Sequence, residues 1–220
     1  MSLLSRLFGG SYSKYDSFIV QWAERKKKQL RSSNQITPEN MFAGFIYGLS
    51  SFAKSIEQFK SSKDIESSAA CSLAGFANDS ALFELGCYHY FQVDMWLFAH
   101  RPDLRQWISQ VFMREFIHLF TQALQINNVA ELFRQKVEKY AEIARTGGNA
   151  EEYHRYLSQL ILRTKDNQRP KPYDFDNELL QLAFIEDMLL KMAIANWEIA
   201  MVPAMIESME ATTELLKRSS

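Results

Sequence analysis

The chain has 220 residues, of which 47% are hydrophobic and 23% are charged, enough for one domain with a sizeable core and marginal for two. Its net charge of −1 argues against a dedicated nucleic-acid-binding protein, because such proteins are usually clearly basic. The chain contains only five Pro and eight Gly, so it has few interruptions, which favours long helices over a β-sandwich.

The amino-terminal segment is apolar and then strongly basic. If residues 2–8 were helical, one apolar face would be formed by Leu3, Leu4, Leu7 and Phe8, and a basic run follows at 25–28. Residues 1–31 contain seven basic and two acidic side chains, a net charge of +5, so the remainder carries −6. An apolar segment beside basic residues is typical of proteins that bind membrane surfaces. The simpler alternatives are a solvated charge run at the end of a helix over about 13–31 and docking to a protein.

The next helices are predicted from start signals and from apolar spacing. Thr37, Pro38 and Glu39 form a strong helix start, with a capping hydroxyl, a proline in the first turn and an acid near the positive end of the dipole. Apolar residues then recur at helical spacing as far as Phe59. A polar break at 61–64 precedes a short predicted helix, over about 65–77, that is rich in Ala and Ser.

The segment over about 80–100 predicts a buried helix. It follows the capping sequence 78–80 and is apolar nearly all round, which is typical of a central helix. Further helices are predicted over about 102–125, 129–146, 150–164 and 176–215, and Pro203 should kink or divide the last one. We read 165–175, which contains two prolines, as a loop.

These elements predict an all-α fold, a single-domain bundle of about seven or eight helices around a central apolar helix. Residues 1–10 would be a short amphipathic segment, 11–215 the helical domain and 216–220 a flexible tail. Cys71 and Cys87 lie among apolar residues, so we expect buried free thiols, which suit a reducing cytoplasm. We do not interpret 188–206 as transmembrane, because it contains polar and charged residues and a proline.

One pattern suggests a metal site. Glu115 and His118 are three residues apart on one helix, and helical di-iron and di-manganese proteins use this pair twice, together with two further glutamates. Glu115 falls within an apolar stripe, as does Glu186 on the last helix, and Glu84 lies in the apolar central helix. We therefore take Glu84, Glu115, His118 and Glu186 as candidate ligands, for iron or manganese.

The metal pattern is incomplete, however. No histidine follows His154, and Leu189 occupies the position where a second histidine should follow Glu186. A second Glu-x-x-His pair begins at Glu151, but an acid in the first turn of a helix is explained by the helix dipole alone. The alternative is that these acids pair with Arg, Lys, Tyr or His, with no cofactor bound.

No complete catalytic arrangement stands out in the sequence. Methionines recur on one stripe of the last predicted helix, and aromatic residues make up 13% of the chain. Adaptable methionine-rich surfaces can serve binding, although a methionine stripe also suits a core. The leading interpretation is a non-enzymatic interaction or regulatory protein that binds a protein partner. A metal- or cofactor-binding bundle is the first alternative, and membrane docking through residues 1–31 is the second.

Overall fold

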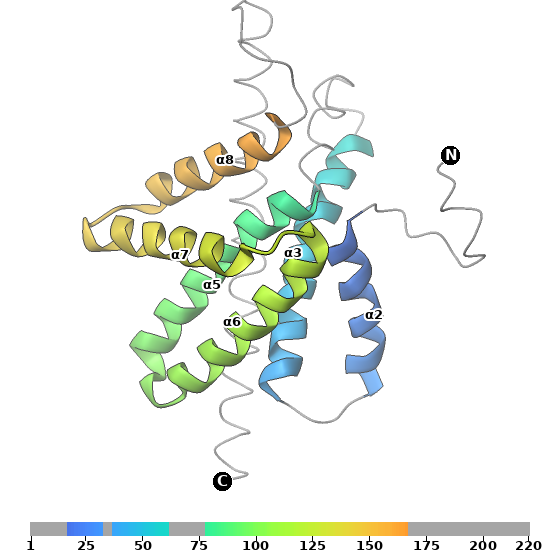
Figure 1. The fold of residues 1–220 in the computed structure, drawn as a ribbon, viewed down its shortest axis with the longest axis horizontal. Coiled ribbons are helices and arrows are strands. Elements are labelled where there is room, and N and C mark those ends of the chain that lie inside the picture. The colour runs from blue at the N-terminus through green and yellow to red at the C-terminus, as the bar shows by residue number, and fades with distance from the viewer. Residues whose placement is uncertain (1–16, 33–36, 62–77, 167–220) are drawn as a thin grey trace, which may run out of the picture.

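The computed structural model describes residues 17–32, 37–61 and 78–166, and this part of the chain is all-α, without a strand (Figure 1). Its helices are α2 (Phe18–Ser32), α3 (Pro38–Ser61), α5 (Asp79–His100), α6 (Pro102–Leu124), α7 (Val129–Arg145) and α8 (Ala150–Asp166). The helices predicted over 65–77 and 176–215 lie outside the described residues.

Local signals explain where several of these helices begin and end. The Asn78 side chain accepts a hydrogen bond from the backbone N–H of Ala81 at 2.8 Å and so caps α5. Gly147 adopts φ +76° just after α7, a conformation that glycine reaches without strain. The Asn149 side chain then accepts from the N–H of Glu152 at 3.1 Å and starts α8.

Helix α5 contacts every other described helix. It runs antiparallel to α6, because Tyr90 contacts Ser109 whereas Asp94, further along α5, contacts Arg105, earlier in α6. Helices α2 and α3 pack against each other and against α6, while α7 and α8 pack against each other and against α5. Figure 1 shows the α5–α6 pair between the α2–α3 pair and the α7–α8 pair.

The core between these helices is largely aromatic. The Phe116 ring is fully buried and lies 4.4 Å from that of Phe120 and 5.0 Å from that of Phe133, measured between ring centres. Phe116 also packs directly over Gly86 of α5, where an added Cβ would lie only 2.6 Å from the ring. The close approach of α5 and α6 therefore depends on the absence of a side chain at this glycine.

Polar groups are also buried around α5. Cys87 is a buried free thiol, as predicted, and Cys71 lies outside the described residues. His89 is buried on the same helix. Among the described helices, none is long and apolar enough to span a lipid bilayer.

Candidate functional site

An open hollow of about 420 Å³ lies between the carboxyl-terminal half of α5 and the amino-terminal half of α6. We call it the α5–α6 groove. Because residues three or four apart share one face of a helix, the two antiparallel helices each supply a stripe of lining side chains. The lining consists of Tyr90, Asp94, Pro102, Arg105, Gln106, Ser109, Gln110 and Met113.

A network of hydrogen bonds joins the two walls of the groove. Arg105 donates from Nε to Oδ1 of Asp94 at 3.0 Å and from Nη2 to Oδ2 at 2.6 Å. The Ser109 hydroxyl donates to Oδ1 of the same carboxylate at 2.7 Å. On the next turn, the Tyr90 hydroxyl donates to the carbonyl oxygen of Ser109 at 3.2 Å. A bidentate, charge-assisted pair is rigid, so it fixes the spacing of the two walls.

The same contacts determine the ionisation states of Asp94 and Tyr90. Burial raises the pKa of Asp94, but the hydrogen bonds from Arg105 and Ser109 outweigh burial and leave that pKa below its ordinary value. Burial, followed by the negative charge of Asp94, raises the pKa of Tyr90 to about 12. At neutral pH Asp94 is therefore ionised and Tyr90 keeps its proton, so the tyrosine can act as a donor.

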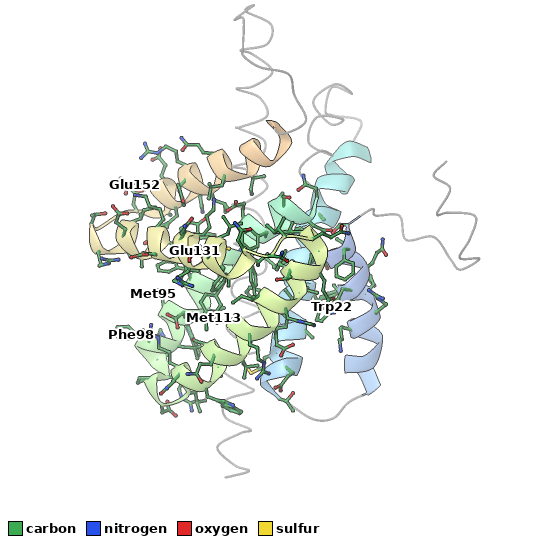
Figure 2. The ribbon with its side chains drawn as sticks, viewed as in Figure 1. Trp22, Met95, Phe98, Met113, Glu131 and Glu152 are labelled. Carbon is green, nitrogen blue, oxygen red and sulfur yellow. The ribbon has the colours of Figure 1, made fainter. Side chains whose placement is uncertain are left out.

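Large apolar side chains surround the groove. Met113 lines it and is 40% exposed, and Phe98, one turn beyond Asp94 on α5, is 58% exposed. The Phe98 ring lies 5.0 Å from the guanidinium carbon of Arg105. Met95 is exposed beside them on α5, and Figure 2 shows these three labelled side chains below α7. Large exposed apolar side chains beside polar groups are typical of binding surfaces.

Trp107 is also large, apolar and exposed, but it belongs to another face of α6. It precedes Met113 by six residues, which places it about 120° around the helix from Met113. Trp107 does not line the groove, so it provides a matched position outside the site.

Each candidate metal ligand within the described residues has a protein partner. Glu84 is mostly buried, as predicted, and pairs with Lys136 of α7 at 3.0 Å; their side chains are only 12% and 18% exposed. Glu115 is half-buried and pairs at 2.9 Å with its neighbour Arg114. His118 is exposed, and its Nε2 lies 2.9 Å from Nε2 of Gln122.

Three or more metal-ligating side chains do not gather anywhere within the described ranges. Glu186, the fourth candidate, lies outside those ranges, so the carboxylate site remains a prediction. In the second Glu-x-x-His pair, Glu151 is exposed in the first turn of α8, which agrees with its interpretation as a helix-start acid. His154 packs edge-on to Tyr88, with 6.5 Å between ring centres.

The predicted membrane-binding segment is described only in part. Residues 1–16 lie outside the described residues. On α2, the Lys26 ammonium lies 5.6 Å from the centre of the half-buried Trp22 ring, and Arg25 is exposed. The contact with Trp22 holds the Lys26 ammonium against its own helix. Membrane docking remains a prediction.

The α5–α6 groove was not predicted from the sequence. The available signal is a pair of polar residues spaced four apart on each side of the Arg101-Pro102 turn, namely Tyr90 and Asp94 before it and Arg105 and Ser109 after it. Such spacing places each pair on one helix face. Only the orientation of α5 against α6 makes the two faces meet.

Comparison with known proteins gives no match to a family model, a curated protein or a solved structure.

Proposed function

We propose that this chain is a non-enzymatic interaction protein that binds a partner protein through the α5–α6 groove. The observation that supports the proposal is the combination of a polar, hydrogen-bonded floor with three large exposed apolar side chains, Met95, Phe98 and Met113. Protein interfaces combine apolar anchors with a polar surround, and methionine and aromatic residues are enriched in them. Methionine also adapts its shape to a partner.

The rigid floor favours binding further. Asp94 and Arg105 hold each other in a bidentate pair at 3.0 and 2.6 Å. These side chains are therefore already ordered before a partner binds. Preorganised sites bind more tightly because less conformational entropy is lost on association. Because α5 and α6 lie side by side, the groove between them suits a helix of the partner.

The scaffold of the groove, we propose, is a bundle of about seven or eight helices with α5 at its centre. The contacts of α5 with each of the other described helices support this arrangement. Helices α2 and α3 both pack against α6 and so support one of the two helices that line the groove.

Affinity capture with matched variants of the full chain tests the function. Met113→Glu changes a side chain that lines the groove, and Phe98→Ser changes one that contacts the lining residue Arg105. Trp107→Glu changes an exposed apolar residue on another face of α6. We expect the partner to be retained by the wild type and by Trp107→Glu, and to be lost from both groove variants. Thermal unfolding of each variant verifies the fold. A partner whose binding is independent of both groove substitutions would refute the proposal.

A further inference from the structure

Arg105 has hydrogen-bonding capacity that the groove itself does not use. A guanidinium group carries five N–H donors and no acceptor. Arg105 uses Nε and Nη2 to bind Asp94, and within the described part of the chain its Nη1 has no hydrogen-bond partner. The side chain is 39% exposed and lines the groove. A ligand in the groove can therefore meet a charged donor.

The acidic groups nearby are already satisfied. Among the described residues, Asp94 is the only carboxylate that lines the groove, and it accepts from both Arg105 and Ser109. Asp103, at the start of α6, pairs with Arg101 at 2.9 Å. Gln106 and Gln110 add exposed amide groups to the lining. The group that complements this set is an acceptor with a negative charge, because it would satisfy Arg105 without displacing Asp94.

A carboxylate alone would bind weakly. An exposed ion pair contributes about 0–1 kcal/mol, since water and salt screen it, so the acid must arrive with apolar groups that exclude water. Phe98 and Met113 are both exposed apolar side chains next to Arg105 or in the same lining. The apolar and charged contacts therefore occur together in one site.

From this complementarity we infer that the groove receives an amphipathic helix of the partner that carries a carboxylate next to large apolar side chains. The carboxylate binds Nη1 of Arg105, and the apolar side chains pack on Phe98 and Met113. This inference rests on the proposed function and specifies the chemistry of the partner.

The test begins with selection of random 16-residue peptides displayed on phage, using the full chain as the target. Peptides are kept if they bind the wild type and Trp107→Glu but not Met113→Glu, so that only groove binders remain. We expect these to be enriched in Asp or Glu next to Leu, Phe, Trp or Met. Enrichment of basic or uncharged peptides would overturn the inference while leaving groove binding intact. Recovery of no groove-dependent peptide would count against both the inference and the proposed function.

Synthetic versions of the selected peptide then test the role of Arg105. Replacing the peptide Glu by Gln should weaken binding to the wild type about tenfold, as expected for a lost charge-assisted hydrogen bond. The double variant Asp94→Asn/Arg105→Gln removes both charges, so that neither is left unpaired, and it should bind the two peptides equally. Equal binding of the two peptides to the wild type would overturn the inference. Preferential binding of a phosphorylated version that lacks the Glu would do so as well.

Discussion

Asp79, the first residue of α5, binds the amino terminus of α2 through the backbone of Phe18. Its Oδ2 accepts from the N–H of Phe18 at 2.9 Å, and its Oδ1 accepts from the N–H of Ile19 at 3.0 Å and from the hydroxyl of Ser17. The first N–H groups of a helix have no partner within the helix. One carboxylate therefore caps a helix that lies about sixty residues earlier in the chain.

Replacing Asp79 by Ala should lower the free energy of unfolding by about 1–2 kcal/mol, because the amide groups at the start of α2 lose their acceptor. Asp79→Asn keeps one side-chain oxygen and should lose less. Urea denaturation of the three proteins measures the difference. Equal stabilities of the wild type and Asp79→Ala would show that this contact does not stabilise α2.

Two helical glycines should respond in opposite ways to alanine. At Gly86 an added Cβ would lie 2.6 Å from the Phe116 ring and 3.1 Å from Leu49, so Gly86→Ala should destabilise the fold by about 1–3 kcal/mol. At exposed Gly44 no residue of the described ranges comes within 4 Å of the added atom, so Gly44→Ala should stabilise α3 by about 0.5–1 kcal/mol. Thermal denaturation compares the two. A stabilised Gly86→Ala protein would contradict the packing of α6 on α5.

The Cys87 thiol should be unreactive in the folded protein. Burial, followed by the negative charge of Glu84, raises the pKa of this thiol well above its ordinary value, and the thiolate is the reactive form. In a Cys71→Ser variant, we expect labelling of Cys87 by a disulfide reagent to be about a hundredfold slower in native buffer than in urea. Labelling at the same rate in both conditions would show that Cys87 is accessible.

His89 should make stability depend on pH near neutrality. Burial lowers the pKa of His89 well below 6.5 and outweighs the opposing hydrogen bond with Gln92. The folded imidazole is therefore neutral, whereas the unfolded one gains a proton as the pH falls through about 6.5. The stability associated with neutral His89 is therefore fully present above that pH. Below it, the free energy of unfolding falls by at most about 1.4 kcal/mol per pH unit.

Urea denaturation at pH 7.5 and 5.5 measures this effect, and His89→Gln should flatten the dependence. Asp94 affects stability at lower pH, because its pKa in the folded protein is held below the ordinary value. Its contribution to the free energy of unfolding is present above about pH 4 and is lost as the pH falls further. An unchanged pH dependence in His89→Gln would assign the effect to other groups.

Local structure could be predicted from the sequence because its signals span only a few residues. Pro38 and Asn78 each mark a helix start that the structure confirms, and Gly147 lies just after the end of α7. The apolar character of 80–100 correctly indicated a helix, and most of its residues over 81–93 are buried, with Glu84 largely buried among them. Its last turns, however, expose Met95 and Phe98. These features depend on periodicity and capping, which operate within one helix.

Contacts between helices could not be predicted in the same way. Nothing in the sequence marks Lys136 as the partner of Glu84, 52 residues earlier, or directs Arg105 towards Asp94. Glu115, expected within an apolar stripe, is only half-buried and pairs with its neighbour Arg114. The groove likewise depends on how two helices face each other, which is decided by packing over the whole core.

The most direct test of the central claim is photo-crosslinking of the full chain with a benzophenone amino acid at position 113, at position 98 or at position 107. If the α5–α6 groove binds a partner protein, positions 113 and 98 will crosslink to the same partner, and position 107 will not. Equal crosslinking from position 107 would contradict the account. So would crosslinks from position 113 that join only a second copy of this chain or another segment of it.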